Sequence, residues 1–407
     1  GSVGAQHARK ILKVMDLAEK TGAPLVAILD TAGARLDEGL DAMNAYAMIA
    51  GRVSALSGVV PQISLVLGPC GGIASAIAGM TDITVMSENG ALFVNGPMVV
   101  SAASGKQVDM KTMAGPEASV QSGVAELTAK TDEEAIALAR KLIAMLPVNN
   151  MDDAVTPSAD DVNRELVELN GIDKVDDVRD LMRSIADMRD IVELGEGFAA
   201  SMVTALGKIG GATVGFIANQ AAKDEGRLTV YGCKKAARFA AFCDCFSIPI
   251  VTIVDSMGMK ISTAPQGELS RTGAQLMFAL TEATTVRIAL IAGNAVGMGY
   301  AAMASRASAD MVYAWPGAVI SAVTPKIAVQ LTQADELKGA DDPYAKREEL
   351  ENRYMDDVAD GVNAAKLGYV DDVIEPAQTR QMIAAALEML SGKRESRPAK
   401  KHGNMPL

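Results

Sequence analysis

Two glycine-rich segments have the residue types and spacing that could carry chemistry. The first is GPCGGI, from Gly68 to Ile73, and the second is GNAVGMG, from Gly293 to Gly299. Each follows an apolar run and precedes small residues, as in a turn from a strand into a helix. In such a turn, glycines let successive backbone N–H groups point outward, where they can stabilise an oxygen that becomes negative. Glycines can also serve only the close packing of helix on strand, but the second occurrence favours an oxyanion site.

Charged residues near these segments give weaker signals. Asp30 in DTAGAR and Asp255 in DSMGMK each end a β-branched run, where an aspartate usually caps the following turn or helix. An acidic protein that binds a polyanion needs local positive charge, so some basic residues are candidates to meet phosphates. These candidates are Arg35, Lys106, Lys260 and Lys326.

The two turns lie in two copies of one longer segment. Residues 10–33 parallel residues 235–258 in sequence. Asp30 and Asp255 are 225 positions apart (255 − 30), and the same separation relates the glycines at 72 and 297 (297 − 72). Because this register stays constant over about 60 residues, it indicates a duplicated domain and not a short solenoid repeat.

Each copy predicts an α/β fold. An amphipathic helix leads into a Pro-led β-branched run (PLVAILD or PIVTIVD), a Gly-containing turn, a second helix, an apolar strand and the glycine-rich turn. Helices and buried strands that alternate at this spacing are typical of βαβ units with parallel pairing. We therefore expect an N-terminal domain over residues 1–150 and a C-terminal domain over residues 197–407.

The segments outside the two copies are polar. Residues 151–196 carry fourteen acidic and five basic side chains, and we expect a solvated acidic linker with short helices. The tail from Ser391 onward is basic and contains proline. We expect this tail to lie along a surface or a partner subunit, or to fray.

Composition excludes several function classes. The 407 residues hold 38 basic and 50 acidic side chains, a net charge of −12, so nucleic acid is not an expected partner. His7 and His402 are the only histidines and the four cysteines form no CxxC pair, which disfavours a metal site, a histidine-based triad and a disulfide framework. A reducing cytoplasm is the expected location. The sequence has no GxxxxGK[ST] phosphate loop and no apolar stretch of membrane-spanning length.

Five stretches together resemble the carboxyltransferase component of biotin-dependent acyl-CoA carboxylases and decarboxylases. They are GAPLVAILDTAGARLDEG, VVPQISLVLGPCGG, KAARFAAFCDCFSIPIVTIVDSMG, YAWPGAVISAV and the ending from GYVDDVIEP onward. The resemblance spans essentially the whole chain. It implies two tandem crotonase-like domains in one polypeptide, with acyl-CoA bound in the first and biotin in the second. It also implies a homo-oligomer, a dimer or a trimer of dimers, whose sites are built across a dimer interface.

The resemblance implies transfer of a carboxyl group between the ureido nitrogen of biotin and the α-carbon of a CoA thioester. The thioester passes through an enolate and biotin through a ureido anion, so two oxyanion sites are needed and a metal is not. By position, N–H groups around Gly72 and Ile73 would meet the thioester oxygen, and those around Met298 and Gly299 the biotin carbonyl. Further residues that the resemblance places in contact with substrate are Gly71, Arg35, Ala74, Gly297 and Ala301.

The same resemblance implies separate partners. Biotin would sit on a biotin carboxyl carrier protein, and a biotin carboxylase or a membrane decarboxylase subunit would complete the system. The direction of transfer and the acyl group stay open. The chain also begins some tens of residues into the first domain of family members, so we expect either a fragment or a chain completed by another polypeptide.

The chain departs from the family pattern at three places. Family members commonly have a second glycine where this chain has Ile73 and Met298, and Val-Pro-Gly-Phe where it has SMGM, from Ser256 to Met259. A backbone N–H is kept at Ile73 and at Met298, but the width of the pocket changes at both. Catalysis is still expected, whereas the size of the substrate is not fixed.

Two other function classes remain open from the sequence. A crotonase-type hydratase or isomerase would need a carboxylate over the substrate, and Asp82, Glu88 and Glu117 lie in the right region of the sequence. A non-catalytic assembly subunit could keep the CoA-binding shape without the chemistry. Carboxyl transfer to or from biotin separates the favoured class from both, because neither alternative can perform it.

Overall fold

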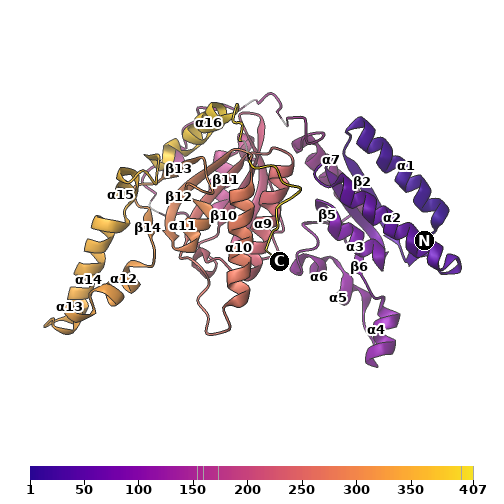
Figure 1. Cartoon of the computed structure of the whole chain (residues 1–407), viewed down its shortest axis with the longest axis horizontal. Coiled ribbons are helices and arrows are strands. Elements are labelled where there is room, and N and C mark those ends of the chain that lie inside the picture. Colours follow the sequence, from indigo (N-terminus) through magenta and orange to yellow (C-terminus); the bar gives the residue numbers. More distant parts are fainter. Residues whose placement is uncertain (154, 159, 173, 396, 407) are drawn as a thin grey trace. The chain divides into compact units, whose positions relative to one another are not determined.

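The computed structural model describes residues 1–153, 155–158, 160–172, 174–395 and 397–406, and its contacts divide the chain into two compact units. The first unit comprises residues 1–155 and 194–198, and the second comprises residues 156–193 and 199–407. Each unit is an α/β body built around its own sheet (Figure 1).

A five-stranded sheet forms the centre of the first unit, with strands in the order β2-β4-β5-β7 and with β6 beside β4, all parallel. Its strands are β2 (Leu25–Thr31), β4 (Gln62–Gly71), β5 (Ile83–Ser87), β6 (Ala91–Phe93) and β7 (Leu127–Ala129), and a separate pair joins β1 (Ser2–Val3) to β3 (Gly33–Ala34). The helices are α1 (Ala5–Thr21), η1 (Leu36–Glu38), α2 (Leu40–Leu56), α3 (Ile73–Met80), α4 (Pro97–Ser104), α5 (Met110–Ala114), α6 (Pro116–Gln121) and α7 (Asp132–Met145).

An eight-stranded sheet forms the second unit, in the order β15-β13-β12-β11-β10-β9-β8, with β14 beside β12. Strands β9 and β10 are antiparallel, and the pairs from β10 through β12 to β15 are parallel. The strands are β8 (Ile191–Leu194), β9 (Met202–Ile209), β10 (Ala212–Asn219), β11 (Ile250–Ser256), β12 (Arg287–Val296), β13 (Met311–Ala314), β14 (Val319–Ser321) and β15 (Asp372–Val373).

Helices of the second unit pack on this sheet, and a group of them extends beyond it (Figure 1). The extending helices α12 (Pro325–Thr332), α13 (Ala334–Lys338) and α14 (Pro343–Tyr354) share a small core of their own. The remaining helices are η2 (Val167–Leu169), α8 (Val178–Ile185), η3 (Asp187–Arg189), η4 (Asp224–Gly226), α9 (Val230–Cys245), α10 (Gly267–Glu282), α11 (Met298–Met303), η5 (Met355–Ala359), α15 (Gly361–Lys366), η6 (Pro376–Gln378) and α16 (Thr379–Leu390).

Strand register confirms the duplication. In the first unit β2 and β4 pair Leu29 with Val66, and then skip to Thr31 with Cys70. In the second unit β11 and β12 pair Val254 with Ile291, and then skip to Ser256 with Ala295. Each of these residues is 225 positions from its counterpart, so both copies carry the same bulge at the same place (256 − 31 and 295 − 70). Since bulges are specific features of a fold, this agreement confirms two copies of one α/β architecture, as expected.

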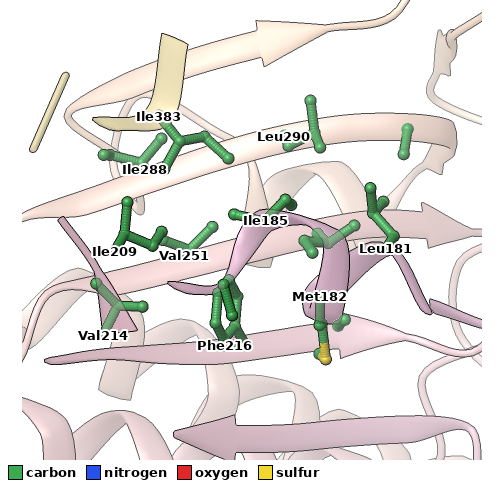
Figure 2. Packing of buried hydrophobic residues seen from close by; sticks show 14 of the residues in the cluster. Leu181, Met182, Ile185, Ile209, Val214, Phe216, Val251, Ile288, Leu290 and Ile383 are labelled. Atoms are coloured by element: carbon green, nitrogen blue, oxygen red, sulfur yellow. The ribbon is translucent and has the colours of Figure 1, made fainter. Parts of the chain in front are cut away.

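The segment expected to be an acidic linker contains a buried helix, α8. Leu181, Met182 and Ile185 of α8 are almost fully buried in the core that covers one face of the eight-stranded sheet (Figure 2). These positions fall on one side of a helix at 3.6 residues per turn, while Asp180 points to solvent. Asp180 is the only acidic residue within α8, so the high acid count of residues 151–196 comes from the segments around this helix. By its contacts, the helix belongs to the second unit.

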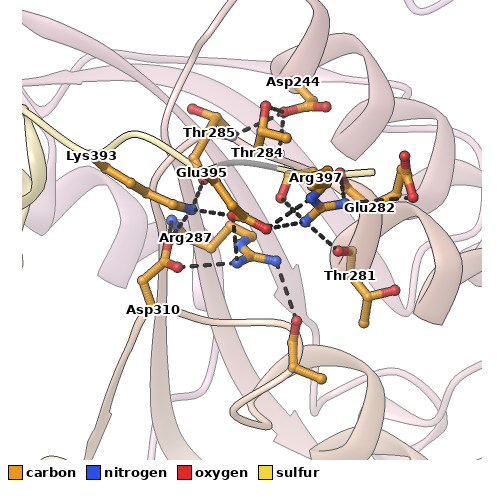
Figure 3. Close-up of polar contacts among 12 residues, drawn as sticks. Asp244, Thr281, Glu282, Thr284, Thr285, Arg287, Asp310, Lys393, Glu395 and Arg397 are labelled. Carbon is orange, nitrogen blue, oxygen red and sulfur yellow. Dashed lines mark hydrogen bonds and ion pairs between the residues drawn. The ribbon is translucent and has the colours of Figure 1, made fainter. Parts of the chain in front are cut away.

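The C-terminal tail is held on the second unit by an ionic network (Figure 3). Lys393 donates to Asp310 at 2.9 Å, and Glu395 pairs with Arg287 at 3.6 Å and with Lys393 at 3.1 Å. Arg397 donates to Glu395 and to the carbonyls of residues 281, 282 and 283, where α10 ends. The tail therefore lies along a surface, one of the arrangements expected from its sequence. Arg397 donates to backbone carbonyls at the end of α10 that have no hydrogen-bond donor within the helix.

Replacing Arg397 by methionine is expected to lower the free energy of unfolding of the second unit by about 1–2 kcal/mol, because the carbonyls at the end of α10 lose a charged donor. Urea unfolding of the full chain measures this. Arg394→Met is the matched control, since the Arg394 side chain bonds only the neighbouring Lys393 carbonyl among the described residues. Equal losses in the two variants would show that Arg397 does not stabilise the helix end.

None of the helices in the described part of the chain combines the length and the hydropathy that crossing a membrane would require.

Candidate active site

In the first unit the glycine-rich turn links β4 to α3. Gly72 is the N-cap of α3, at φ 64° and ψ −132°, a conformation open to glycine and strained for other residues. Its N–H donates to the Phe93 carbonyl at 2.9 Å. Ile73 and Ala74 follow as the first two helical residues, whose N–H groups have no acceptor within the helix. A Cβ built on Gly72 would meet no atom within 4 Å, so the space beside this residue is open.

The second unit repeats this construction where β12 meets α11. Gly297 is the N-cap, at φ 52° and ψ −115°, and its N–H donates to the Ser321 carbonyl at 2.8 Å. Met298 and Gly299 then begin α11. The two acceptors, Phe93 and Ser321, lie in the short strands β6 and β14, which pair with the ends of β4 and β12.

This geometry changes which donors are available. The sequence predicted Gly72 and Ile73 as one pair and Met298 and Gly299 as the other. In the structure the Gly72 N–H is already used by Phe93, so the groups left at the first turn are those of Ile73 and Ala74. The sequence could not reveal this bond, because the register of the ALF strand against β4 is not visible in it.

A second loop approaches each turn from the neighbouring strand. Thr31 and Ser256 end β2 and β11, and each hydroxyl accepts the N–H of the glycine two residues on, at 3.2 Å. Those glycines, Gly33 and Gly258, have φ of 111° and 86°. A Cβ on either would lie 3.2 Å from a backbone oxygen of the adjacent turn. Both glycine-rich turns therefore have an equivalent neighbouring loop, with a hydroxyl at the same position and the same close approach of backbone.

The strand-end aspartates sit at the two bulges. The Asp255 carboxylate accepts the backbone N–H of Asn294 at 2.9 Å and its side-chain amide at 3.1 Å, so it is held by a residue of β12 at the bulge. The expected role of a local cap is thus replaced by a bond to the adjacent strand. In the first unit Pro69 stands at the position equivalent to Asn294 (294 − 225) and has no N–H to donate, and Asp30 is exposed.

Gly293→Ala is expected to lower the free energy of unfolding by about 1–3 kcal/mol, because the new Cβ would lie 2.5 Å from the Asp255 carboxylate, which two hydrogen bonds hold. Urea unfolding of the full chain measures this. Gly68→Ala is the matched control in the first unit. Its Cβ would lie 2.5 Å from Asp30, but that exposed carboxylate can turn away. Equal losses at both positions would contradict the role given to Asp255.

The remaining predicted contact residues lie near the turns with different surroundings. Gly71 precedes the N-cap, and a Cβ there would lie 2.6 Å from the Phe93 ring. Ala74 is almost fully buried, and Ala301 donates its N–H to the Gly297 carbonyl at 3.0 Å. Arg35 follows β3 and is paired with Glu38 at 2.9 Å, so a phosphate would have to compete with a carboxylate for it.

Titratable groups at the turns do not supply a nucleophile. Burial raises the pKa of the Cys70 thiol, which lies inside the first turn sequence, to about 12, so the thiol stays protonated at neutral pH. Burial also raises the pKa of the Tyr300 phenol, two residues after Met298. No cluster of three or more His, Cys, Asp or Glu side chains that could hold a metal ion occurs among the described residues.

Of the carboxylates considered for a hydratase, Asp82 lies away from the turn. Asp82 precedes β5 and accepts the Gln62 N–H at the start of β4, so it lies at the edge of the parallel sheet opposite to the turn. Glu88 and Glu117 are both exposed, and Glu117 accepts a bond from Gln121 on its own helix. The feature that the two units share is the pair of backbone N–H groups that begins the helix after each turn.

Comparisons with known proteins agree on one family. The model of the carboxyl transferase domain matches residues 1–405. The chain is 40% identical to the methylmalonyl-CoA carboxyltransferase 12S subunit of Propionibacterium freudenreichii subsp. shermanii, covering 100% of this chain and 79% of that subunit. It is 39% identical to the methylmalonyl-CoA decarboxylase subunit alpha of Propionigenium modestum, covering 100% of this chain and 81% of the relative.

A solved structure supports the same conclusion. The transcarboxylase 12S crystal structure, described as a hexamer assembly with methylmalonyl-coenzyme A and methylmalonic acid bound, superimposes with a TM-score of 0.94. It is 39% identical in sequence, and the match covers 100% of this chain and 80% of that one. With the duplicated α/β units and their paired turns, these matches show that the chain belongs to the carboxyl transferase domain family.

Proposed function

We propose that this chain is the carboxyltransferase component of a biotin-dependent acyl-CoA carboxylase or decarboxylase. The observation that carries the proposal is the repeated turn, in which an N-cap glycine uses its own N–H internally and the next two N–H groups start a helix. Two such turns suit a reaction in which two carbonyl oxygens gain negative charge. The family relationship supplies the reaction class.

In the first unit, the N–H groups of Ile73 and Ala74 would hold the thioester oxygen of the acyl-CoA. A carbonyl oxygen that becomes an enolate binds two fixed donors more tightly than the ground-state thioester does, and this difference lowers the barrier. The open space beside Gly72 leaves room for the acyl group to reach the turn. Arg35, which follows β3, is the basic candidate for a CoA phosphate in this unit, and it would exchange Glu38 for that phosphate.

In the second unit, the N–H groups of Met298 and Gly299 would hold the ureido carbonyl of biotin. Biotin supplies a ureido nitrogen that accepts or donates the carboxyl group. The donor set fits this group, because two fixed N–H donors match one carbonyl oxygen and no charged side chain competes at Gly297 to Gly299 in the sequence. Ala301 lies one helical turn further along α11 and is half-buried.

Partners and direction form the finer part of the proposal. A biotin carboxyl carrier protein would bring the biotin, and a biotin carboxylase or a membrane decarboxylase subunit would complete the cycle. The relatives include both a carboxyltransferase and a decarboxylase subunit, so the sequence match does not favour one direction. A homo-oligomer is supported by the hexamer named for the solved relative. The cysteine pattern of the sequence supports a cytoplasmic location.

The test is carboxyl transfer itself. The full chain is incubated with malonyl-, methylmalonyl- or glutaconyl-CoA and biocytin, and loss of the carboxyl group is followed by mass spectrometry. Biotin-dependent decarboxylation of one thioester would support the proposal and identify the acyl group. If neither biocytin nor a biotinylated carrier protein supports decarboxylation, the chain is a non-catalytic assembly subunit. Light scattering at micromolar concentration tests the oligomer separately, since a monomer would contradict shared sites.

A further inference from the structure

Two methionine side chains of the second unit converge on one glycine of α10. A Cβ built on Gly273 would lie 3.5 Å from Cε and 3.7 Å from Sδ of Met259, and 3.7 Å from Cε of Met298. Met259 follows the positive-φ Gly258 in the loop after β11, and Met298 is the first residue of α11. Three separate segments therefore bring two thioethers together over Gly273.

The glycine has a packing reason to be there. A glycine inside a helix is less favourable than an alanine, because it loses more backbone freedom on folding. Gly273 nevertheless stands in the seventh position of the sixteen-residue α10 and is buried. Without a side chain at this position, both methionine ends fit against the helix. An isoleucine- or valine-sized group would have to displace them.

The two methionines are also next to the proposed biotin donors. The backbone N–H of Met298 would hold the ureido carbonyl, and the thioether is the side chain of that same residue. Met259 and Met298 are both only half-buried, which leaves part of their surface open. Methionine is flexible and polarisable, and it adapts to the shape of an apolar ligand better than a rigid side chain does. Positions 259 and 298 are also two of the places where the sequence departs from the family pattern.

We propose that Met259 and Met298, seated against Gly273, form the apolar wall of the biotin site and limit how deeply the fused ring system enters it. The proposal rests on the function proposed above and assigns these side chains a specificity role. The differences from the family pattern at positions 259 and 298 then depend on each other, because the flexible Met259 side chain leaves room for the Met298 side chain, where family members commonly have glycine.

The test separates the two substrates of the full-length enzyme. KM and kcat are measured for biocytin at saturating acyl-CoA, and then for acyl-CoA at saturating biocytin. Gly273→Val is expected to lower kcat/KM for biocytin about tenfold or more, the size of effect that an added methylene has in an apolar pocket. KM for acyl-CoA should not change. Gly273→Ala should have little effect, because its Cβ would make ordinary contacts at 3.5–3.7 Å.

Met298→Gly provides the decisive second variant, since it keeps the backbone N–H and removes the side chain. Alone, it is expected to raise KM for biocytin about tenfold through loss of apolar contact. In the double variant with Gly273→Val, part of the kcat/KM for biocytin that Gly273→Val alone loses should return. The valine then has no Met298 side chain to push into the biotin site, so the effects of the two changes are coupled. Met389→Leu, a change at an exposed methionine of α16, is the matched control and should leave all constants unchanged.

Three results would overturn the proposal. The first is an unchanged KM for biocytin in Met298→Gly, and the second is strict additivity in the double variant. The third is an effect on KM for acyl-CoA in place of biocytin. If Gly273→Val does not fold, Met298→Gly still decides the question. Absence of any biotin-dependent reaction in the unmodified enzyme would instead show that the proposed function is wrong, and this inference with it.

Discussion

Replacing Ile73 by proline is expected to lower kcat for biotin-dependent decarboxylation by about 10²–10³, the usual cost of one lost oxyanion donor. Proline has no N–H, and it is tolerated at the first position of a helix, where that N–H has no intrahelical acceptor. Ile73 occupies this position in α3. The residue before it is Gly72, which has no Cβ to clash with the proline ring. The variant thus removes the proposed donor while the helix can still form.

Ile73→Ala is the matched control, because it removes the side chain and keeps the N–H. It is expected to change KM for the acyl-CoA more than kcat, since Ile73 is partly exposed beside the open space at Gly72. Binding of free CoA, which has no acyl carbonyl, should be the same in both variants and shows that the first unit is folded. Full activity in Ile73→Pro would mean that the thioester oxygen binds elsewhere.

The repeated architecture was predictable because it depends on residue types that are close together in the sequence. Proline-led β-branched runs, strand-end glycines and a constant separation of 225 positions indicate strands, turns and duplication without any tertiary information. Both N-cap glycines, Gly72 and Gly297, do adopt positive φ, as the turns required. These features depend on backbone sterics within a few residues, so the identities of those residues are enough to predict them.

The finer assignment of donors depended on contacts between distant segments. The Gly72 N–H donates to the Phe93 carbonyl, and the Asn294 N–H donates to the Asp255 carboxylate. Each bond joins segments whose relative register comes from packing. Composition was also misleading for α8, because averaging over 151–196 hid four buried apolar residues on one side of a short helix. Sequence patterns gave the positions of the turns, but strand pairing decides which N–H groups remain for a substrate.

Replacing Arg380 by methionine is expected to lower the free energy of unfolding of the second unit by about 3–5 kcal/mol. The Arg380 side chain is fully buried and donates to Asp187 at 2.7 Å and to the Asp161 carbonyl at 3.1 Å. It also donates to the carbonyl of Ile185, at the end of α8. Methionine keeps much of the volume but leaves the buried carboxylate of Asp187 without its counter-charge. Urea unfolding of the full chain at pH 7 measures the loss.

Arg183→Met on α8 is the control for this change. Arg183 is exposed and pairs with Asp180, which is also exposed, so its loss should cost less than about 0.5 kcal/mol. A similar loss in the two variants would mean that the Arg380 effect comes from a general sensitivity of this region and not from the buried pair.

The pH dependence shows whether charge or packing carries the Arg380 effect. Burial by itself raises the pKa of Asp187, but hydrogen bonds from Arg380, Ser158 and the N–H groups of Gly211 and Gly210 outweigh burial, so the pKa lies below its usual 3.8. A lowered carboxyl pKa stabilises the folded state above the unfolded pKa, and this stabilisation is lost as the pH falls through the folded pKa.

In Arg380→Met the carboxyl of Asp187 loses its strongest opposing partner, so its pKa in the folded state is expected to rise. Acidification then protonates a buried carboxylate that has no counter-charge, which relieves part of the penalty. The difference in unfolding free energy between the original chain and the variant should therefore shrink between pH 7 and pH 4. A difference that stays constant over this range would assign the cost to lost packing and hydrogen bonds, because those contributions do not titrate.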